Sequence, residues 1–577
     1  MEREGRMSLQ PMITGSRYMI STGQYLATQA GHAILEEGGN AIDAGVAAGI
    51  ALGVVHADQV QFSGVAPMLI YLAERNEVVS IAGLGWWPKA ATLDMFVHGY
   101  GGEIPLGLAR TVIPAAPDAW ILALERYGTM SFSQVAKAAI RYARDGFAMH
   151  ACMAAFIDQF EDSYRLFPST ADLFLPGGEP IKTGQLFVQA DLANSLQYMA
   201  DQEAAAKGDR ASGLKAARDA FYKGDLAHAM TKYHRENGGL LTLEDLASYS
   251  SEIEHPLTVK FGDIDVYSCQ PWCQGPSLLQ MLAMLDGSNL RTLPHNSTEY
   301  IHLVAETMNL AFADREAYFG DPRFVDVPMD VLLSQSYLDT RRALLDPDRA
   351  FGKMPPAGNI AGFRRHHDHV NKAATPPNPG ALIGDTSYVC VVDAKGNAFS
   401  ATPSDVSWEG PIIPGLGFCP SLRGSQSWAV EGHPSAIAPG KRPRLTPNPS
   451  LAMRPGEFIM PFGAPGGDMQ PQGMLQVFLN HFVFGMSIQD AIDAPRFVTH
   501  SHPNSFEPHG YAPGRLLLER SIGEDRAKAL SAKGHDVQWL PDISLGTAGV
   551  CAVVADRKTG ILYGGADPRR SARAMGW

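Results

Sequence analysis

The stretch Gly384-Asp-Thr-Ser-Tyr-Val-Cys-Val-Val-Asp-Ala-Lys-Gly-Asn397 marks an abrupt change in the character of the chain. From Thr386 onward, β-branched and aromatic residues run as far as Asp393, and a second run of this kind covers residues 398–402. The intervening Lys395-Gly-Asn397 is typical of a tight turn. We therefore expect a β-hairpin that opens a sheet, with Thr386 as its first residue.

The segment before this hairpin, residues 345–385, has the composition of an exposed linker. It contains scattered glycines, the basic run Arg364–His369, and the prolines Pro355, Pro356, Pro376, Pro377 and Pro379. The histidines and Asp368 are metal-ligand types, but two adjacent arginines and the lack of a periodic scaffold favour a solvated loop.

Hydrophobic periodicity predicts most of the remaining elements. Residues 24–36 form an amphipathic helix that ends at Gly38-Gly-Asn40, and residues 41–55 form a second helix packed on it. Residues 115–310 are mostly helical by pattern. Strands are expected at residues 68–72, 78–82, 458–462, 549–555 and 561–563, and later helices at 470–482 and 488–494. The pattern indicates two sheets covered by helices.

Composition excludes several classes of protein. The 577 residues carry 47 basic and 60 acidic side chains, so the net charge is 47 − 60 = −13, which argues against binding to nucleic acid through bulk charge. Apolar residues make up 45% and charged residues 19%, as in a folded globular protein. No signal peptide and no membrane span are expected. Six cysteines are too few for a disulfide framework, so we expect a reducing, cytoplasmic compartment.

Familiar catalytic signatures are missing from the sequence. It has no Gly-x-Ser-x-Gly elbow, no His-Glu-x-x-His, no phosphate-binding loop and no dinucleotide fingerprint. Cys269 and Cys273 form the one close cysteine pair, and no second ligand pair follows at zinc-finger spacing. We expect no metal and no cofactor.

The segment from Thr386 to Asn397 resembles the start of the small subunit in the γ-glutamyltranspeptidase family. Further motifs of that family follow in its order along nearly the whole chain. They are Gly38–Ala44, Phe221–Gly224, Gly239–Tyr249, Ala311–Arg315, Gly320–Pro322, Pro439–Pro443, Gly463–Asp468, Asp493–Phe497 and Ala566–Arg569.

The resemblance implies an N-terminal-nucleophile hydrolase made by self-cleavage. Its fold class would be α+β, a four-layer αββα sandwich with an added helical layer in the large subunit. Cleavage between Asp385 and Thr386 would give a large subunit, residues 1–385, and a small subunit, residues 386–577, of 577 − 385 = 192 residues. The two would remain together as a heterodimer, and a dimer of two such heterodimers is left open.

The chemistry of an N-terminal threonine supports this interpretation. A threonine hydroxyl is a weak nucleophile until a base removes its proton, and a free α-amine with a pKa near 7.7–8.0 is a base suited to neutral pH. Cleavage before Thr386 creates that amine. In the precursor, the hydroxyl of Thr386 would attack the Asp385 carbonyl and rearrange the amide to an ester before hydrolysis.

The resemblance also implies the supporting residues. It places the oxyanion hole at Gly466-Gly467, where the backbone N–H groups are unobstructed by side chains. The competing interpretation of this glycine pair is a plain loop. It gives Ser404 the role of a hydroxyl that hydrogen-bonds the nucleophile, although Ser404 could also be a surface turn residue.

Four expected substrate anchors differ from the family pattern. Leu84 stands where an arginine would hold the γ-glutamyl carboxylate, Val406 replaces an asparagine, and Leu445-Thr446 replaces a pair of serines. The segment Arg423–Trp428 contains no carboxylate to bind an ammonium group. Because a buried charge without a partner costs several kcal/mol, γ-glutamyl is a doubtful acyl group. Arg423 could instead hold one carboxylate of the acyl group, or it could be a surface arginine.

We expect a self-cleaving, Thr-dependent amidohydrolase that acts on a small amide with a non-γ-glutamyl acyl part, such as an oxamate-like compound or a dicarboxylic monoamide. Two alternatives remain. One is a genuine γ-glutamyltransferase or glutathione hydrolase. The other is an unprocessed pseudoenzyme that serves as a binding protein.

Overall fold

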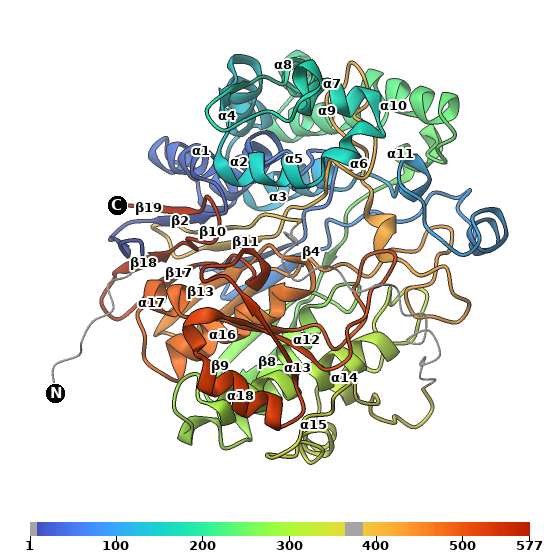
Figure 1. Ribbon diagram of the computed structural model, residues 1–577. Helices are drawn as coiled ribbons and strands as arrows, with labels where there is room; N and C mark the ends of the chain where they lie inside the picture. Colours follow the sequence, from blue (N-terminus) through green and yellow to red (C-terminus); the bar gives the residue numbers. More distant parts are fainter. Residues whose placement is uncertain (1–8, 364–384) are drawn as a thin grey trace.

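The computed structural model describes residues 9–363 and 385–577 of the chain. Two seven-stranded antiparallel sheets form its centre (Figure 1). The first sheet has, in spatial order, β1 (Ile13–Gly15), β18 (Leu562–Gly565), β17 (Cys551–Asp556), β13 (Phe458–Gly463), β12 (Ser450–Arg454), β9 (Ile264–Ser268) and β8 (Leu257–Phe261). The second has β19 (Arg573–Gly576), β2 (Met19–Thr22), β10 (Val389–Val392), β11 (Ala398–Ala401), β3 (Met68–Leu72), β4 (Glu77–Ile81) and β7 (Ile253–Glu254).

Helices cover the outer faces of both sheets (Figure 1). On the second sheet lie α1 (Tyr25–Glu36), α2 (Ala41–Val55) and α3 (Ala116–Tyr127), and outside them α4 (Phe132–Asp145), α8 (Ala190–Ala205), α9 (Arg210–Tyr222) and α10 (Asp225–Glu236). On the first sheet lie α12 (Gly275–Asp286), α16 (Gln470–Phe482) and α17 (Ile488–Asp493). Outside them, α13 (Thr298–Tyr318) packs on α12, and α18 (Glu524–Ala532) packs on α13. The two sheets and the helices on their outer faces form the predicted four-layer αββα sandwich, which is confirmed. The outer helices around α8 form the added helical layer.

Shorter elements complete the described part of the chain. The helices are α5 (Ala151–Gln159), α6 (Glu161–Arg165), α7 (Pro168–Phe174), α11 (Leu243–Ser248), α14 (Met329–Leu332) and α15 (Gln335–Arg342). Strands β14 (Phe497–Thr499), β15 (Arg515–Glu519) and β16 (Asp536–Leu540) form a third sheet, and β5 (Phe147–Ala148) pairs with β6 (Leu186–Phe187).

Three hydrophobic clusters match this layering. One fills the space between the two large sheets, with side chains such as Tyr71 and Cys390 from the second sheet and Leu451 and Val553 from the first. The other two lie between each sheet and its helices. The inner strands β2, β3, β10, β11 and β13 are buried on both faces. This explains why β10 reads as the continuous apolar run Val-Cys-Val-Val rather than as an alternating pattern.

Helix α2 connects the sequence signal near residue 40 to the second sheet. Asn40 caps the helix, and its capping box is completed by Asp43. A Cβ on Gly45 would lie 2.1 Å from the Phe399 ring of β11, and one on Gly49 would lie 2.5 Å from the Trp120 ring of α3. Gly45 and Gly49 of α2 thus leave room for aromatic side chains. The close approach of α1 to α2 depends instead on Gly31 of α1, which faces the carbonyl of Ala44 in α2.

The hairpin predicted at Thr386 forms as β10 and β11, which pair from Val389 with Ala401 to Val392 with Ala398. Asp393 fixes the turn by accepting hydrogen bonds from the N–H groups of Lys395 (2.8 Å) and Asn397 (3.0 Å). The hairpin does not begin a separate sheet, because β10 pairs with β2 and β11 with β3 from the N-terminal part of the chain.

Two further expectations need correction or limits. The stretch 115–310, expected to be mostly helical, includes β8 and β9, where apolar residues alternate with polar ones around a turn at Gly262-Asp263. In the linker, residues 345–363 contain no helix or strand, whereas the basic run Arg364–His369 and Gly384 lie outside the described residues. In the described part of the chain, no helix is long and apolar enough to cross a bilayer.

Candidate active site

Thr386 sits at the entrance to β10 in a strained backbone conformation. Its side chain is fully buried, and its φ of +89° lies in the left-handed region that β-branched residues rarely adopt. The N–H of Thr386 donates to the carbonyl of Gln59 (3.0 Å), and the N–H of Ser387 donates to the carbonyl of Pro403 (3.0 Å). These bonds hold the residue in place, and strain of this kind is concentrated at functional sites.

The hydroxyl of Thr386 faces that of Ser404. The two oxygens are 2.6 Å apart, and Ser404 is itself fully buried just beyond β11, where its N–H donates to the carbonyl of Val65 (3.0 Å). Arg423 Nη2 donates to Ser404 Oγ at 2.6 Å. Ser404 is therefore an interior residue in contact with Thr386, and the surface-turn alternative for it is wrong.

Gln470, at the start of α16, approaches Thr386 from the other side. In the amide orientation that satisfies its own hydrogen bonds, the nitrogen donates to Asn448 Oδ1 (2.9 Å) and to the carbonyl of Thr446 (3.0 Å). The amide oxygen then lies 3.5 Å from Thr386 Oγ1.

Asp385, the residue before Thr386, contacts the same group through both its backbone and its side chain. Its carbonyl oxygen accepts a hydrogen bond from the N–H of Gly466 at 3.3 Å. Its carboxylate forms an ion pair with Arg423 Nη1 and accepts from Ser404 Oγ at 3.3 Å. The peptide bond between residues 385 and 386 thus lies between the Thr386 hydroxyl and a backbone N–H donor.

The glycine pair lies at the turn between β13 and α16. Gly466 has a φ of +125° and Gly467 a φ of +55°, and a Cβ on Gly466 would lie 3.1 Å from Cα of Ala548. Gln274 Nε2 donates to the carbonyls of Gly467 and Thr446, both at 2.8 Å. The turn is thereby held with the N–H of Gly466 directed at Asp385.

A buried ion pair supports this turn from behind. Arg315 pairs with Asp468 and donates to Gln274 Oε1 at 2.9 Å. Asp468 also accepts from the N–H and the hydroxyl of Ser505. Burial alone would raise the pKa of Asp468. The Arg315 guanidinium and the Ser505 hydrogen bonds nevertheless hold this pKa well below its usual range. Asp468 is therefore ionised at neutral pH, and its contacts with Arg315 and Ser505 hold the glycine turn.

Arg423 is 1% exposed, so the interpretation of it as a surface arginine is wrong. Besides Asp385 and Ser404, its Nε lies 3.6 Å from Asp405 Oδ1, and its guanidinium lies 5.5 Å from the centre of the Phe506 ring. Burial raises the pKa of Asp405 to about 6, although Arg423 and two hydrogen bonds from the segment 421–422 oppose that effect.

Of the other three predicted substrate residues, one belongs to the hydrogen-bonded group around Thr386 and two pack in hydrophobic clusters. Thr446 belongs to it, because its carbonyl accepts from Gln274 and its hydroxyl accepts from Gln426 Nε2 at 2.9 Å. Leu84 is packed in the cluster between the sheets, and Val406 in the cluster beneath the helices of the second sheet. Contact of Leu84 and Val406 with a substrate stays a prediction.

Four glutamine and acidic residues of this group had no role assigned from the sequence: Gln59, Gln274, Asp405 and Gln470. They come from loops and helix starts far apart in the chain, so no periodic pattern connects them. Arg315 and Asp468 did stand in stretches that match family motifs, and those motifs were the available signal.

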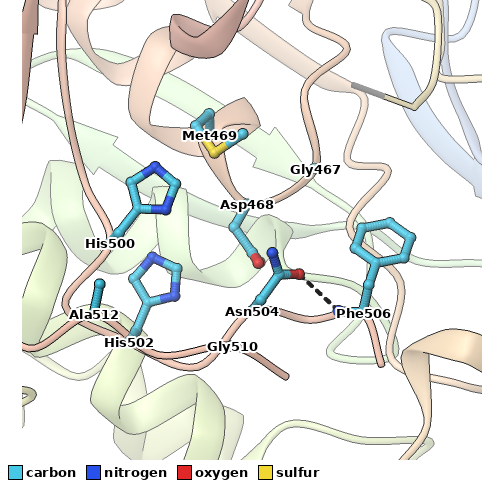
Figure 2. Close-up of a pocket in the computed structure, with 9 residues that line it drawn as sticks. All are labelled: Gly467, Asp468, Met469, His500, His502, Asn504, Phe506, Gly510 and Ala512. Atoms are coloured by element: carbon cyan, nitrogen blue, oxygen red, sulfur yellow. Dashed lines mark hydrogen bonds between the residues drawn. The ribbon is translucent and has the colours of Figure 1, made fainter. Parts of the chain in front are cut away.

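A small cavity of about 20 Å³ adjoins the glycine turn (Figure 2). Gly467, Asp468, His500, His502 and Phe506 are among its lining residues, and the volume is enough for one water molecule. Burial lowers the pKa of His500 to about 4, and burial together with Arg315 lowers that of His502, so both rings are neutral at pH 7. Within the described residues, no group of three or more metal-ligating side chains comes together.

Comparison with known proteins agrees with this geometry. The family model described as gamma-glutamyltranspeptidase matches residues 27–577. The chain belongs to the γ-glutamyltranspeptidase family. It is 33% identical to the acylase ACY 1 proenzyme of Pseudomonas sp. (strain SE83), over 96% of this chain and 92% of that protein. It is 30% identical to the glutathione hydrolase proenzyme of Bacillus subtilis (strain 168), over 97% and 92%.

Solved structures give the same result for the fold. The crystal structure of cephalosporin acylase from Bacillus halodurans superimposes with a TM-score of 0.83, at 27% identity, over 100% of this chain and 99% of that one. The predicted N-terminal-nucleophile hydrolase fold is therefore confirmed, as is the prediction that the chain is an enzyme of the amide-hydrolase type. For a member of the γ-glutamyltranspeptidase family, the group around Thr386 is the place where catalysis is expected.

Proposed function

We propose that this chain is a precursor that cuts itself between Asp385 and Thr386 and then hydrolyses a small amide through an ester on Thr386 Oγ1. One observation carries the proposal. The Thr386 hydroxyl lies 2.6 Å from Ser404 Oγ, while the carbonyl oxygen of Asp385 accepts from the N–H of Gly466. These contacts support the assignment of a nucleophile, a proton acceptor and an oxyanion donor to one peptide bond.

The hydrogen bonds indicate a direction for proton transfer in self-cleavage. Arg423 donates to Ser404, and Ser404 donates to the Asp385 carboxylate, so the hydroxyl of Thr386 donates to Ser404. As Thr386 Oγ1 attacks the Asp385 carbonyl carbon, its proton moves to Ser404, whose own proton moves to the carboxylate. The oxyanion forms beside the N–H of Gly466.

Collapse of this intermediate breaks the bond between the Asp385 carbonyl carbon and the Thr386 nitrogen. The nitrogen takes the proton back through Ser404, which leaves a free α-amine and an Asp385 ester on Thr386 Oγ1. Water then hydrolyses the ester to the α-carboxylate of Asp385 and the free hydroxyl of Thr386.

The two products would remain associated as a heterodimer of residues 1–385 and 386–577. Strands β10 and β11 of the second product pair with β2 and β3 of the first, and β12 pairs with β9 across the other sheet. Separating the fragments would expose both central sheets. Whether two heterodimers associate further stays a prediction.

In the mature enzyme, the α-amine of Thr386 serves as the base. It removes the hydroxyl proton while Oγ1 attacks the substrate carbonyl, and it returns that proton to the leaving amine. Gly466 and Gly467 present N–H groups to the oxyanion, and the loss of one such donor typically costs about 2.7–4 kcal/mol of barrier lowering. Water then releases the acid, and we favour hydrolysis over transfer to another amine.

The acyl group is proposed to be other than γ-glutamyl. Leu84 and Val406 cannot form the polar contacts that an α-amino acid group requires, and the segment 423–428 carries no carboxylate. A buried guanidinium at Arg423 suits an acyl group with one carboxylate and no ammonium group. One finding favours the runner-up, glutathione hydrolysis: the chain is 30% identical to a protein named glutathione hydrolase proenzyme.

Denaturing electrophoresis and N-terminal sequencing of the purified protein test the proposal. We expect two bands, the smaller of which starts at Thr386, and release of ammonia from members of a panel of small amides. The Thr386→Ala variant should stay as one band near 62.2 kDa. An intact, inactive wild-type chain after long incubation would instead identify a pseudoenzyme. Turnover of a γ-glutamyl anilide, accelerated by dipeptides, would identify the runner-up.

A further inference from the structure

The ester formed during self-cleavage has the structure of an acyl-enzyme. Its acyl group is Asp385, attached to the same Thr386 Oγ1 that would carry the acyl group of a substrate. The peptide carbonyl of Asp385 already accepts from the N–H of Gly466, the donor expected to stabilise the oxyanion in catalysis. The uncut chain therefore holds an acyl group in the site, and the contacts of its side chain indicate what the site accepts.

The side chain of Asp385 ends at a buried cation. Its carboxylate pairs with Arg423 Nη1, and Arg423 is 1% exposed. The Phe506 ring covers the guanidinium at 5.5 Å, and a Cβ on Gly424, the next residue, would lie 2.4 Å from the Trp87 ring. Because Arg423 is buried and also donates to Ser404 Oγ at 2.6 Å, the position of its positive charge is fixed relative to Thr386.

Arg423 needs an anion after cleavage. When the Asp385 carboxylate withdraws, the closest remaining charge is Asp405, which lies 3.6 Å from Nε and already accepts from Ser421 Oγ (2.7 Å) and the N–H of Leu422 (3.1 Å). The Nη1 side of the guanidinium then has no carboxylate. Because Asp405 contacts only the Nε side of this buried cation, a substrate carboxylate on the Nη1 side would be bound tightly.

We infer that Asp385 occupies the acyl site of the mature enzyme, and that this enzyme acts on four-carbon dicarboxylic monoamides, compounds with the succinamate skeleton. This inference rests on the proposed function. In Asp385, two carbons separate the carbonyl carbon from the carboxylate, as in a succinyl group. An oxamate places the carboxylate directly on the carbonyl, a glutaryl group adds one carbon, and a γ-glutamyl group adds an ammonium close to Arg423.

Relative rates on matched amides test the inference with processed wild-type protein. We expect kcat/KM for succinamate to exceed that for glutaramate and oxamate by about tenfold or more, the scale of one misplaced methylene. Butyramide, which lacks the carboxylate, should be slower by about a hundredfold, because it leaves the Nη1 side of Arg423 without a carboxylate. Succinate should inhibit competitively, and more strongly than glutarate or oxalate. Equal or faster turnover of glutaramate or oxamate would overturn the inference.

Binding to uncut protein provides a second test that does not depend on turnover. In the Thr386→Ala precursor, Asp385 remains on Arg423, so isothermal titration calorimetry should detect no binding of acetate. The double variant Thr386→Ala, Asp385→Ala frees Arg423 and should gain acetate binding. Equal acetate binding by both precursors would show that Asp385 does not occupy the anion site.

The two levels of the argument fail in different ways. A chain that never cleaves and hydrolyses no amide contradicts the proposed function. A chain that cleaves and turns over amides, but without preference for a carboxylate two carbons from the carbonyl, contradicts this inference alone.

Discussion

The carbonyl oxygen of Asp385 accepts a hydrogen bond from the N–H of Gly466 at 3.3 Å, although 81 positions, 466 − 385, separate the two residues in the chain. The bond to be cut therefore has its oxygen directed at the glycine turn before any reaction. A separation of 3.3 Å is long for a hydrogen bond, as expected for a ground state whose contacts shorten when negative charge develops on the oxygen.

Removal of the Ser404 hydroxyl should slow self-cleavage. Ser404 is the hydroxyl in contact with Thr386 Oγ1, and it connects that oxygen to the Asp385 carboxylate. We expect Ser404→Ala to slow conversion of the precursor by about a hundredfold, within the usual range for a proton-transfer group. The half-time of the full-length band on denaturing gels measures the effect. Ser404→Thr, which keeps the hydroxyl, should cleave at near the wild-type rate, and rapid cleavage of Ser404→Ala would exclude the relay.

Substitution of Gly466 should damage the oxyanion donor. Alanine at φ +125° is strained by about 1–3 kcal/mol, and its Cβ would lie 3.1 Å from Cα of Ala548, so the turn must move. We expect Gly466→Ala to cleave at least about tenfold more slowly.

Gly456 supplies the matched control for this variant. It also has a positive φ, +75°, but it lies between β12 and β13 with no atom within 4 Å of its Cβ position. Gly456→Ala should also lower the melting temperature, through backbone strain alone, and leave the cleavage rate unchanged. Equal slowing by both substitutions would mean that general destabilisation, not the oxyanion donor, controls the rate.

The sequence was sufficient for the elements whose pattern is local. Helix α2 begins and ends at the predicted residues because Asn40 caps it and its small apolar residues continue to Val55. The hairpin at Thr386 was recognisable from two apolar runs around Lys395-Gly-Asn397. In contrast, β8 and β9 lay inside a stretch dominated by helical residues, and their short alternation of five residues each was overlooked.

The candidate site was only partly predictable for a related reason. Thr386, Ser404 and the glycine pair stand in recognisable motifs, but the partners of Arg423 depend on how three loops fold against each other. Its burial, its ion pair with Asp385 and its distance from Phe506 have no local signature in the chain. Gln274 likewise reaches Gly467 from the start of α12, 193 residues away.

Gln274 should matter for catalysis more than its distance from Thr386 suggests. It donates to the carbonyls of Gly467 and Thr446, and without it each of these buried acceptors loses one hydrogen bond, at a net cost of about 0.5–1.5 kcal/mol each. We expect Gln274→Leu to lower the melting temperature, slow self-cleavage and reduce kcat. Gln476→Leu is the control, since Gln476 Nε2 also donates to two buried carbonyls, those of Gln472 and Phe497. A similar rate of self-cleavage for both variants would show that Gln274 does not position the glycine turn.

Acidification should destabilise the fold through histidines that are buried in their neutral form. Burial lowers the pKa of His234 in α10 to about 4, below the 6.5 of an exposed histidine. The unfolded chain therefore binds the proton first, and the stabilisation present above pH 6.5 is lost as the pH falls from about 6.5 to about 4. A shift of 6.5 − 4 = 2.5 in the pKa corresponds to at most about 3 kcal/mol of stability.

Melting temperatures measured over this pH range should fall less steeply for His234→Leu than for the wild type. His228→Leu, which replaces an exposed histidine of the same helix, should keep the wild-type slope. Identical slopes for His234→Leu and the wild type would mean that His234 does not titrate on unfolding.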